Sequence, residues 1–126
     1  MMMLIFGPVA CQPTAKVTDE AVTIIDDVQL AELIEAEPGL VIVDVRPELR
    51  YRTGHIPGAI NIPLPDLRYT DPRFEKAKHV VVYGDGPRNT LSHAAAKKLL
   101  AGGQVVVSDF RGGIDAWRKA GRKLAH

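Results

Sequence analysis

Residues 79–90 read His-Val-Val-Val-Tyr-Gly-Asp-Gly-Pro-Arg-Asn-Thr, and they show the pattern of the fold most clearly. The short apolar run at 79–83 is typical of a strand that is buried on both faces of a parallel sheet. The glycines and the proline at 84–87 end that strand at once. A helical pattern then extends from about Asn89 to Leu100. Strand, glycine-rich turn and helix in this order predict one unit of an α/β protein.

The chain on both sides of this unit repeats the alternation. Further strands are expected at 22–25, 40–45, 59–62 and 104–107, and further helices at 28–36 and 112–120. Either Asp26 or Asp27 can cap the first of these helices. The pattern predicts an α/β fold with a mainly parallel sheet and helices on both faces. Ligands in such folds gather at the carboxyl ends of the strands, so the loop after Tyr83 is the place to expect a site.

The charge balance argues against a nucleic-acid-binding protein. The 126 residues include 16 Lys and Arg against 15 Asp and Glu, a net charge of +1, whereas nucleic-acid binding depends on neutralising many phosphates. Residues 17–44 hold eight acidic and no basic residues, and residues 86–126 hold eight basic and two acidic ones. Solvated helix faces explain such runs most simply, and steering of a small anion towards the C-terminal third is the alternative.

The single cysteine, Cys11, limits the chemistry that is available to the chain. It excludes an intramolecular disulfide, a CxxC redox pair and a zinc site with several thiolates. His79 and His93 lack the spacing of metal ligands. We therefore expect no metal site and no cofactor.

Residues 1–21 are expected to lie outside the folded domain, which we place at 22–126. The first eleven residues are apolar, but a membrane span needs about 20 residues. The sequence VAC at 9–11 resembles the end of a bacterial lipoprotein signal, in which the cysteine receives the lipid, and 12–21 would then be a polar tether. This interpretation predicts a periplasmic protein that reaches the membrane only through lipid on Cys11. A plain cytosolic thiol and a misassigned start codon are the alternatives, and they predict a cytoplasmic protein.

The turn after Tyr83 has the chemistry of an anion site. Backbone N–H groups at the start of a helix lack helical partners and can cradle an anion. Arg88 adds a fork of donors for an oxyanion. A merely structural turn is the alternative, because glycine-rich turns between strands and helices are common. The candidate anion-binding loop consists of Gly84, Asp85, Gly86, Pro87, Arg88, Asn89 and Thr90.

Three ordered motifs resemble the signatures of the rhodanese-like domain. Residues 44–46 (DVR) and 54–63 (GHIPGAINIP) are similar to its first signature, and residues 111–121 (RGGIDAWRKAG) are similar to its second. Between them, VVVY at 80–83 and the following loop stand where that family keeps its active-site loop. The resemblance covers roughly residues 22–121. It implies a five-stranded parallel sheet flanked by helices, and sulfane-sulfur transfer through a cysteine persulfide.

The sequence departs from this family at the nucleophile. Active members place a cysteine directly after the VVVY strand, in a loop of the form C-x-x-G-x-R, whereas here Gly84 occupies that position and Arg88 comes one residue early. Sulfur transfer needs a thiolate, because a soft sulfur must both attack the donor and carry the persulfide. Asp85 does not hold a sulfane sulfur. We therefore expect no sulfurtransferase activity and a binding or regulatory role, with a small oxyanion or an acidic group of a protein partner as ligand.

The rival hypothesis is an enzyme. A sulfurtransferase could use Cys11 or the thiol of a partner, and a hydrolase could use Asp85. A phosphatase is less favoured, because the related phosphatases also use a loop cysteine, in a longer loop. The oligomeric state does not follow from the sequence.

Four other residues have structural interpretations. Asp44 and Arg46 follow a strand near the expected ligand edge and predict an ion pair that braces the loops. His55 is expected to fix its loop through hydrogen bonds. Trp117, which has helical spacing from Ile114, is expected to anchor the core.

Overall fold

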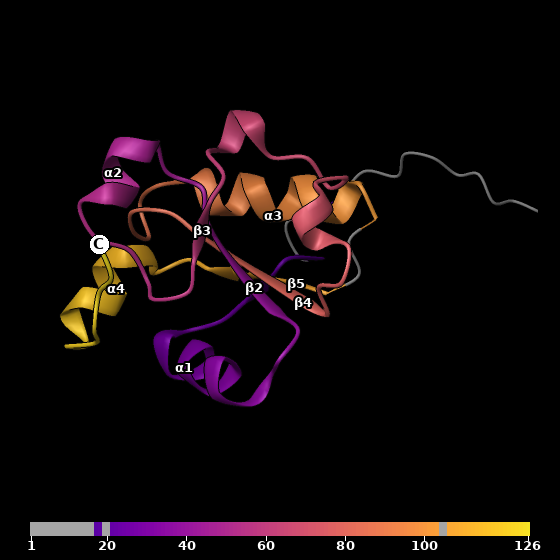
Figure 1. Ribbon diagram of the computed structural model, residues 1–126. Coiled ribbons are helices and arrows are strands. Elements are labelled where there is room, and N and C mark those ends of the chain that lie inside the picture. Colours follow the sequence, from indigo (N-terminus) through magenta and orange to yellow (C-terminus); the bar gives the residue numbers. More distant parts are fainter. Residues whose placement is uncertain (1–16, 19–20, 104–105) are drawn as a thin grey trace, which may run out of the picture.

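The computed structural model describes residues 17–18, 21–103 and 106–126. Five strands form one sheet in the order β1-β5-β4-β2-β3 (Figure 1). Their bounds are Thr23–Ile24 (β1), Leu40–Asp44 (β2), Ile60–Asn61 (β3), His79–Tyr83 (β4) and Val107–Phe110 (β5). All neighbouring strands are parallel, so the predicted α/β fold with a five-stranded sheet is confirmed.

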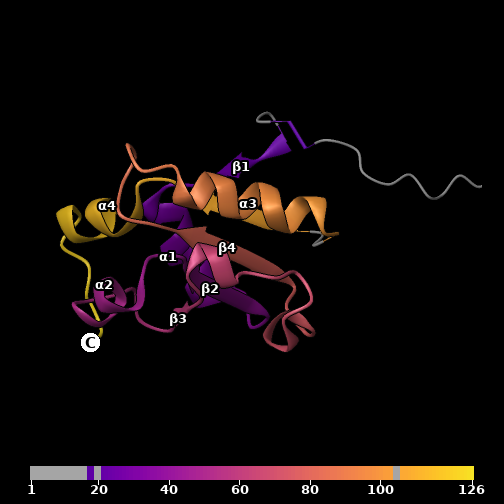
Figure 2. The same cartoon turned by 90° about the horizontal axis from the view of Figure 1, so that it is seen from above.

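Helices cover both faces of the sheet. They are α1 (Asp27–Ala36), α2 (Glu48–Arg52), α3 (Leu91–Ala101) and α4 (Gly113–Lys119), with two short 3-10 helices, η3 (Leu64–Asp66) and η4 (Pro72–Phe74). In Figure 1, α1 lies below the sheet and α3 above it. Seen from above in Figure 2, α3 lies along β4. Helix α2 was not predicted, because five residues are too few to show a helical period.

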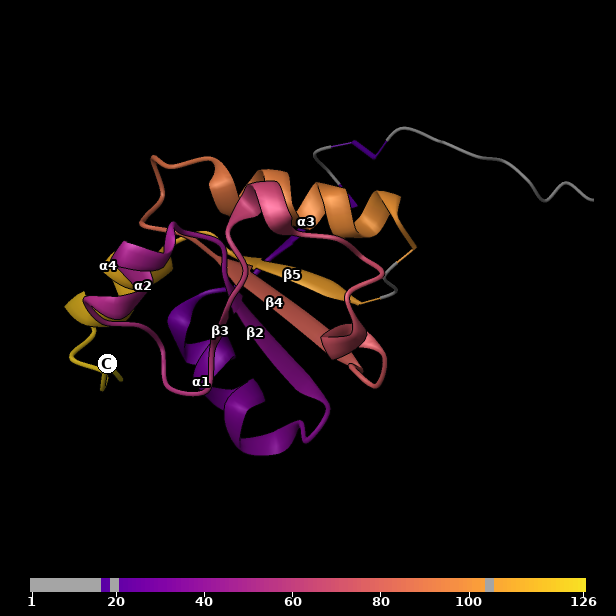
Figure 3. The ribbon, with the colours of Figure 1, turned by 45° about the horizontal axis from the view of Figure 1, so that its top comes forward.

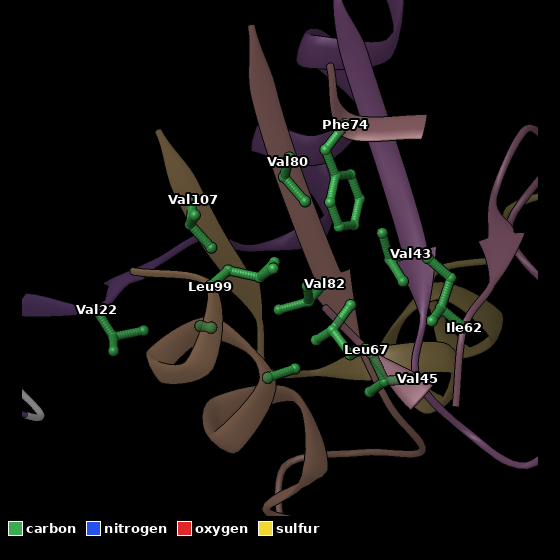
Figure 4. Packing of buried hydrophobic residues seen from close by; sticks show 12 residues of the cluster. Val22, Val43, Val45, Ile62, Leu67, Phe74, Val80, Val82, Leu99 and Val107 are labelled. Carbon is green, nitrogen blue, oxygen red and sulfur yellow. The ribbon is translucent and has the colours of Figure 1, made fainter. Parts of the chain in front are cut away.

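The apolar run of β4 serves two cores. Val80 and Val82 pack on the α3 side of the sheet, where Figure 4 shows their neighbours. Val81 and Tyr83 pack on the opposite side, with α1 and α4. Successive side chains of a strand point to opposite faces, so a strand with a helix layer on each side must be apolar throughout. Trp117 of α4 is buried in the second core, as expected.

The first helix begins at a capping box. The backbone N–H of Gln29 donates to Oδ1 of Asp26 at 2.8 Å, and the backbone N–H of Asp26 donates to Oε1 of Gln29 at 2.9 Å. Of the two candidate caps, Asp26 is therefore the one used, because the reciprocal bonds satisfy two donors at once. This cap places Leu30 in the core beneath the helix.

The prediction of the last strand at 104–107 is wrong. Residues 104–105 lie outside the described residues, Val106 is 42% exposed, and the strand begins at Val107 and continues to Phe110. Ser108 and Asp109 break the apolar pattern, yet both are buried. Ser108 finds its partner in His79, which is distant in sequence, and Asp109 binds Arg111 two residues along the chain.

The three central strands end side by side. Asp44 of β2 is paired with Tyr83 of β4, which is paired with Phe110 of β5. The residues that follow these three strands therefore emerge at one edge of the sheet. Figure 3 shows α2, α4 and the loop that leads into α3 at this end.

The N-terminal predictions concern residues outside the described ranges. Cys11 and most of the proposed tether at 12–21 are among them. Lipid attachment and the domain boundary at 22 therefore stay predictions. Within the described ranges, no helix is both long and apolar enough to cross a membrane.

His79 and Ser108 form a polar pair on the α1 side of the sheet. Nε2 of His79 lies 2.8 Å from Oγ of Ser108 on the neighbouring strand. Burial lowers the pKa of His79 below its ordinary value of 6.5, and the charge of Glu37 opposes this shift only in part. The folded chain therefore binds a proton at this imidazole less readily than the unfolded chain does.

Replacing His79 with Gln should make the free energy of unfolding less dependent on pH below pH 6.5. In the wild type, the contribution of the neutral imidazole is fully present above the unfolded pKa of 6.5 and is lost as the pH falls from there towards the lower folded pKa. The free energy of unfolding should fall by at most about 1.4 kcal/mol per pH unit in this window. Urea unfolding between about pH 5 and pH 8 measures the slope.

The exposed His126 provides the control for this experiment. His126→Gln removes an exposed imidazole, so only a change of slope confined to His79→Gln is assigned to burial. Parallel curves for the wild type and His79→Gln would show that the buried imidazole does not link stability to pH.

Candidate functional site

A buried ion pair joins Asp44, at the end of β2, to Arg46. Nε of Arg46 donates to Oδ1 of Asp44 at 3.0 Å, and Nη2 donates to Oδ2 at 2.7 Å. Nη2 also donates to the carbonyl oxygen of Gly54 at 2.8 Å. Burial alone would lower the pKa of Arg46, but the hydrogen bond and the charge of Asp44 raise it above its ordinary value. The guanidinium therefore stays charged and holds the loop that reaches Gly54 against the sheet.

Two further side chains complete this polar centre. The carboxamide of Asn61 donates to the carbonyl oxygens of Asp44 and Arg46, at 3.0 and 2.9 Å. The hydroxyl of Tyr83 accepts a hydrogen bond from the backbone N–H of Ile56 at 3.1 Å. Burial, followed by the charge of Asp44, raises the pKa of Tyr83 far above its ordinary value. The phenol is therefore a neutral structural group that links β4 to the loop at Ile56.

His55 is tied into its loop from both sides. Its ring stacks on Tyr51 with 3.8 Å between centroids, and its Nδ1 lies 3.0 Å from the carbonyl oxygen of Tyr51. Its backbone exchanges two hydrogen bonds with Ala125, at 2.9 and 2.8 Å. These contacts give His55 the structural position that was expected of it.

The loop after β4 turns two carbonyl groups towards α4. The carbonyl oxygen of Gly84 accepts from the N–H of Ile114 at 3.0 Å, and that of Asp85 accepts from the N–H of Asp115 at 2.9 Å. The described peptide bonds include no cis bond, and in a trans peptide the N–H points opposite to the C=O. The N–H groups of Asp85 and Gly86 therefore point away from α4.

The second half of the loop caps α3. The N–H of Asn89 donates to the carbonyl oxygen of Gly86 at 3.0 Å and closes a turn around Pro87 and Arg88. Oδ1 of Asn89 accepts from the N–H of Leu91 at 2.8 Å. Asn89 thus supplies the cap at the start of α3, where Thr90 makes no side-chain cap bond. Asn89 is therefore part of the frame of the loop.

Gly113 lets α4 approach the loop. Its φ is +65°, and a Cβ at this position would lie 2.5 Å from the carbonyl oxygen of Gly84 and 2.8 Å from the nitrogen of Gly86. No other residue fits both the backbone conformation and the space. The second glycine of the GG pair at 112–113 is therefore required by the loop.

The carboxylate of Asp85 is bound by arginines. Its Oδ1 lies 3.1 Å from Nη2 of Arg50 and 3.8 Å from Nη1 of Arg46, and its Oδ2 accepts from the carboxamide of Asn89 at 3.3 Å. Arg50 belongs to α2, and no sequence pattern indicates this contact. The three partners make Asp85 an internal anion of the site, which is a different role from that of a free nucleophile.

A hollow of about 460 Å³ opens on the outer side of the loop. It is lined by Asp85, Gly86, Pro87, Arg88, Asn89, Asp115 and Lys119. Arg88 is exposed and makes no hydrogen bond or ion pair with any residue that the structure describes. Five of the seven predicted loop residues thus line one hollow, and Lys119 of α4 adds a cation that sequence reasoning missed.

Gly84 occupies the position directly after β4, and the space beside it accepts a side chain. A Cβ there would lie 3.6 Å from Oδ1 of Asn89, 3.6 Å from Cβ of Leu91 and 3.8 Å from the nitrogen of Ser92, all ordinary contacts. The fold therefore accepts a side chain at this position, and the sequence supplies none.

A second ion pair, between Asp109 and Arg111, lies at the carboxyl end of β5. Nε of Arg111 donates to Oδ2 of the fully buried Asp109 at 3.1 Å, and its Nη2 lies 2.6 Å from Nδ1 of His93 on α3. These contacts link β5 to the first turn of α3. Among the described residues, no group of three or more His, Cys, Asp or Glu is arranged to hold a metal ion.

Comparison with known proteins identifies the family of this fold and site. The chain matches the family described as Rhodanese-like domain over residues 26–120. It is similar to the crystal structure of the BH2092 protein from Bacillus halodurans, with a TM-score of 0.76 and 31% identity, over 84% of this chain and 78% of that one. The chain belongs to the rhodanese-like domain family, and the predicted family is confirmed.

The curated relatives that the chain matches have different functions. It is 36% identical over 98 residues to the HTH-type transcriptional regulator Rv0324 of Mycobacterium tuberculosis, covering 76% of this chain and 43% of the regulator. It is 33% identical over 89 residues to the adenylyltransferase and sulfurtransferase UBA4 of Candida albicans, covering 61% of this chain and 19% of that protein. The chain spans 16% to 43% of the length of these curated relatives.

Gly113→Ala should destabilise the fold more than the same change at Gly121. Both glycines have positive φ, +65° and +76°, but a Cβ at Gly121 meets nothing within 4 Å. The left-handed conformation costs about 1 kcal/mol in each variant. The clash with the loop should raise the loss at Gly113 to about 2–4 kcal/mol. Urea unfolding of the two variants measures the difference, and equal losses would refute the close approach of α4 to the loop.

Proposed function

We propose that this domain is a binding or regulatory module that does not transfer sulfur through its own loop. One observation carries the proposal: the residue directly after β4 is Gly84, and glycine has no atom that attacks a sulfur donor or holds a persulfide. The space beside Gly84 would accept a side chain. The surrounding fold is thus intact while the reacting group is absent.

The contacts of Asp85 also support a binding role. Its carboxylate is held by Arg46, Arg50 and Asn89, so attack on a substrate would require the loss of two ion pairs. This weighs against a hydrolase that uses Asp85. The sulfurtransferase alternative then depends on Cys11 or on the thiol of a partner.

The outer rim of the loop is the proposed contact surface. Arg88 is exposed and lines the same hollow as Lys119, and both can meet an oxyanion or an acidic side chain of a protein partner. The Asp85 and Gly86 N–H groups, which point away from α4, can add backbone donors. A transcriptional regulator among the similar proteins is in keeping with a module that serves a larger assembly.

A thiosulfate-to-cyanide assay should separate the binding role from the enzymatic one. The wild type should show no more turnover than Cys11→Ala. Gly84→Cys should restore little turnover, because the loop is still one residue short and its new thiolate would lie beside the Asn89 oxygen. Gly84→Cys with one further residue inserted before Arg88 should restore more, because the longer loop can turn several N–H groups towards the sulfur.

Turnover of both the wild type and Cys11→Ala well above the rate without protein would overturn the proposal, and wild-type turnover well above the Cys11→Ala level would support the alternative of a sulfurtransferase that uses Cys11. Robust turnover of Gly84→Cys alone would show that loop length is not the obstacle. Urea unfolding of each variant confirms that a silent variant is folded.

Titration with sulfate, phosphate and thiosulfate should move the backbone amide signals of residues 84–90 first. The expected affinity is weak, in the millimolar range, because the rim is exposed and a few charged hydrogen bonds give only about 4 kcal/mol. Arg88→Ala should weaken the binding, whereas Arg73→Ala should not, because Arg73 is paired with Asp71 outside the hollow. The absence of loop shifts at millimolar anion would reject the anion-binding role.

A further inference from the structure

The loop at 84–90 contains an anionic side chain, the carboxylate of Asp85. Oδ1 of Asp85 lies 3.1 Å from Nη2 of Arg50 and 3.8 Å from Nη1 of Arg46. Asp85 lines the hollow, whereas the two arginines that bind its carboxylate do not. An anion that approaches these guanidinium groups must therefore compete with the Asp85 carboxylate for the same donors.

The internal carboxylate has two advantages in this competition. It is attached to the loop, so its effective concentration at the arginines is far above that of a free ion. Its contact with Arg46 is also shielded, because the Arg46 side chain is only 3% exposed, and such charge contacts are less screened than surface ones. Millimolar sulfate has neither advantage.

The two arginines that bind Asp85 differ in their other partners. Arg46 is already neutralised by Asp44 at 2.7 Å, whereas Asp85 is the only carboxylate that pairs with Arg50 among the residues that the structure describes. Arg50 is 56% exposed, and its guanidinium pairs with the Asp85 carboxylate at 3.1 Å. Arg50 is therefore the donor that becomes available when the negative charge of Asp85 is removed.

We infer that Asp85 is a specificity-determining residue, which keeps free small oxyanions away from Arg46 and Arg50 and confines them to the rim formed by Arg88 and Lys119. The inference rests on the proposed binding role of the loop and adds a cause for weak anion binding. It predicts that removing one charge at Asp85 creates an inner oxyanion site that the wild type lacks.

Asp115 provides a matched control for the charge itself. It lines the same hollow, and its side chain is 54% exposed with only a 4.0 Å contact to Arg118. Asp115→Asn and Asp85→Asn remove the same charge from the same hollow. Only Asp85→Asn removes the charged partner of Arg50. A gain in sulfate affinity in Asp85→Asn alone is therefore due to the Arg50 guanidinium, whereas an equal gain in both variants is due to the loss of one negative charge.

The experiment is a sulfate titration of the full chain, followed by the amide signals of the loop. Asp85→Asn should bind sulfate at least about ten-fold more tightly than the wild type, and Asp115→Asn should stay within about three-fold of it. The Asp85→Asn side chain keeps the size of the original and can still accept from Asn89. Urea unfolding and an unchanged amide spectrum outside residues 84–90 show that the fold is retained.

A second pair of variants tests which donor is released. Adding Arg50→Ala to Asp85→Asn should abolish the gain. Adding Arg52→Ala should keep it, because Arg52 on the same helix is paired with Glu48 at 2.7 Å and not with the loop. In the wild-type background, Arg50→Ala and Arg52→Ala should change sulfate affinity equally, because Arg50 is occupied by Asp85.

The outcomes distinguish this inference from the proposed function. Equal affinities for Asp85→Asn and Asp115→Asn, or a gain that survives Arg50→Ala, would overturn the role of Asp85. A wild type without any loop shift would reject the proposed binding role, even if Asp85→Asn binds sulfate. Weak wild-type binding together with an Arg50-dependent gain in Asp85→Asn would support both.

Discussion

The buried ion pair between Asp44 and Arg46 is the contact on which the site edge depends. Both side chains are almost fully removed from water, and burial of a charge is unfavourable unless a partner and further hydrogen bonds compensate for it. Arg46 has that compensation from Asp44 and from the Gly54 carbonyl. Removing either partner would leave an uncompensated buried charge, a loss of about 3–5 kcal/mol. The pair therefore fixes the chain from the end of β2 to Gly54 and places α2 beside the loop.

Charges of alternating sign extend this contact into the loop. Asp44 holds Arg46, Arg46 lies near Asp85, and Asp85 in turn holds Arg50. On the other side of the loop, Arg111 binds Asp109 at the end of β5. Each of these carboxylate-arginine pairs is formed by residues two apart near the end of a strand. The Asp44 and Arg46 pair contacts the loop through Asp85, and the Asp109 and Arg111 pair contacts α3 through His93. Such bracing keeps a loop in one conformation whether or not it carries a reacting group.

A catalytic site needs both a structural frame and a reacting group, and this site has only the frame. The frame is kept: the parallel sheet, the close approach of Gly113 and the capped start of α3. The reacting group is absent at Gly84. Asp85 adds a negative charge where an anionic substrate would otherwise meet two arginines. The site thus combines a hydrogen-bonded frame, an internal counter-ion and exposed cations at its rim, and the proposed recognition of an anionic group rests on this combination.

Features that depend on neighbouring residues were predictable from the amino-acid sequence alone. The strand, turn and helix at 79–90 follow from local pattern, the missing nucleophile is a matter of residue type at Gly84, and the pair of Asp44 and Arg46 lies within three residues. Tertiary structure decided the rest. It moved the last strand to Val107–Phe110, because Ser108 is satisfied by His79, and it joined Asp85 to Arg50 on a helix too short to be predicted. Those contacts join segments about thirty residues apart, and only the packed sheet brings them within hydrogen-bonding distance.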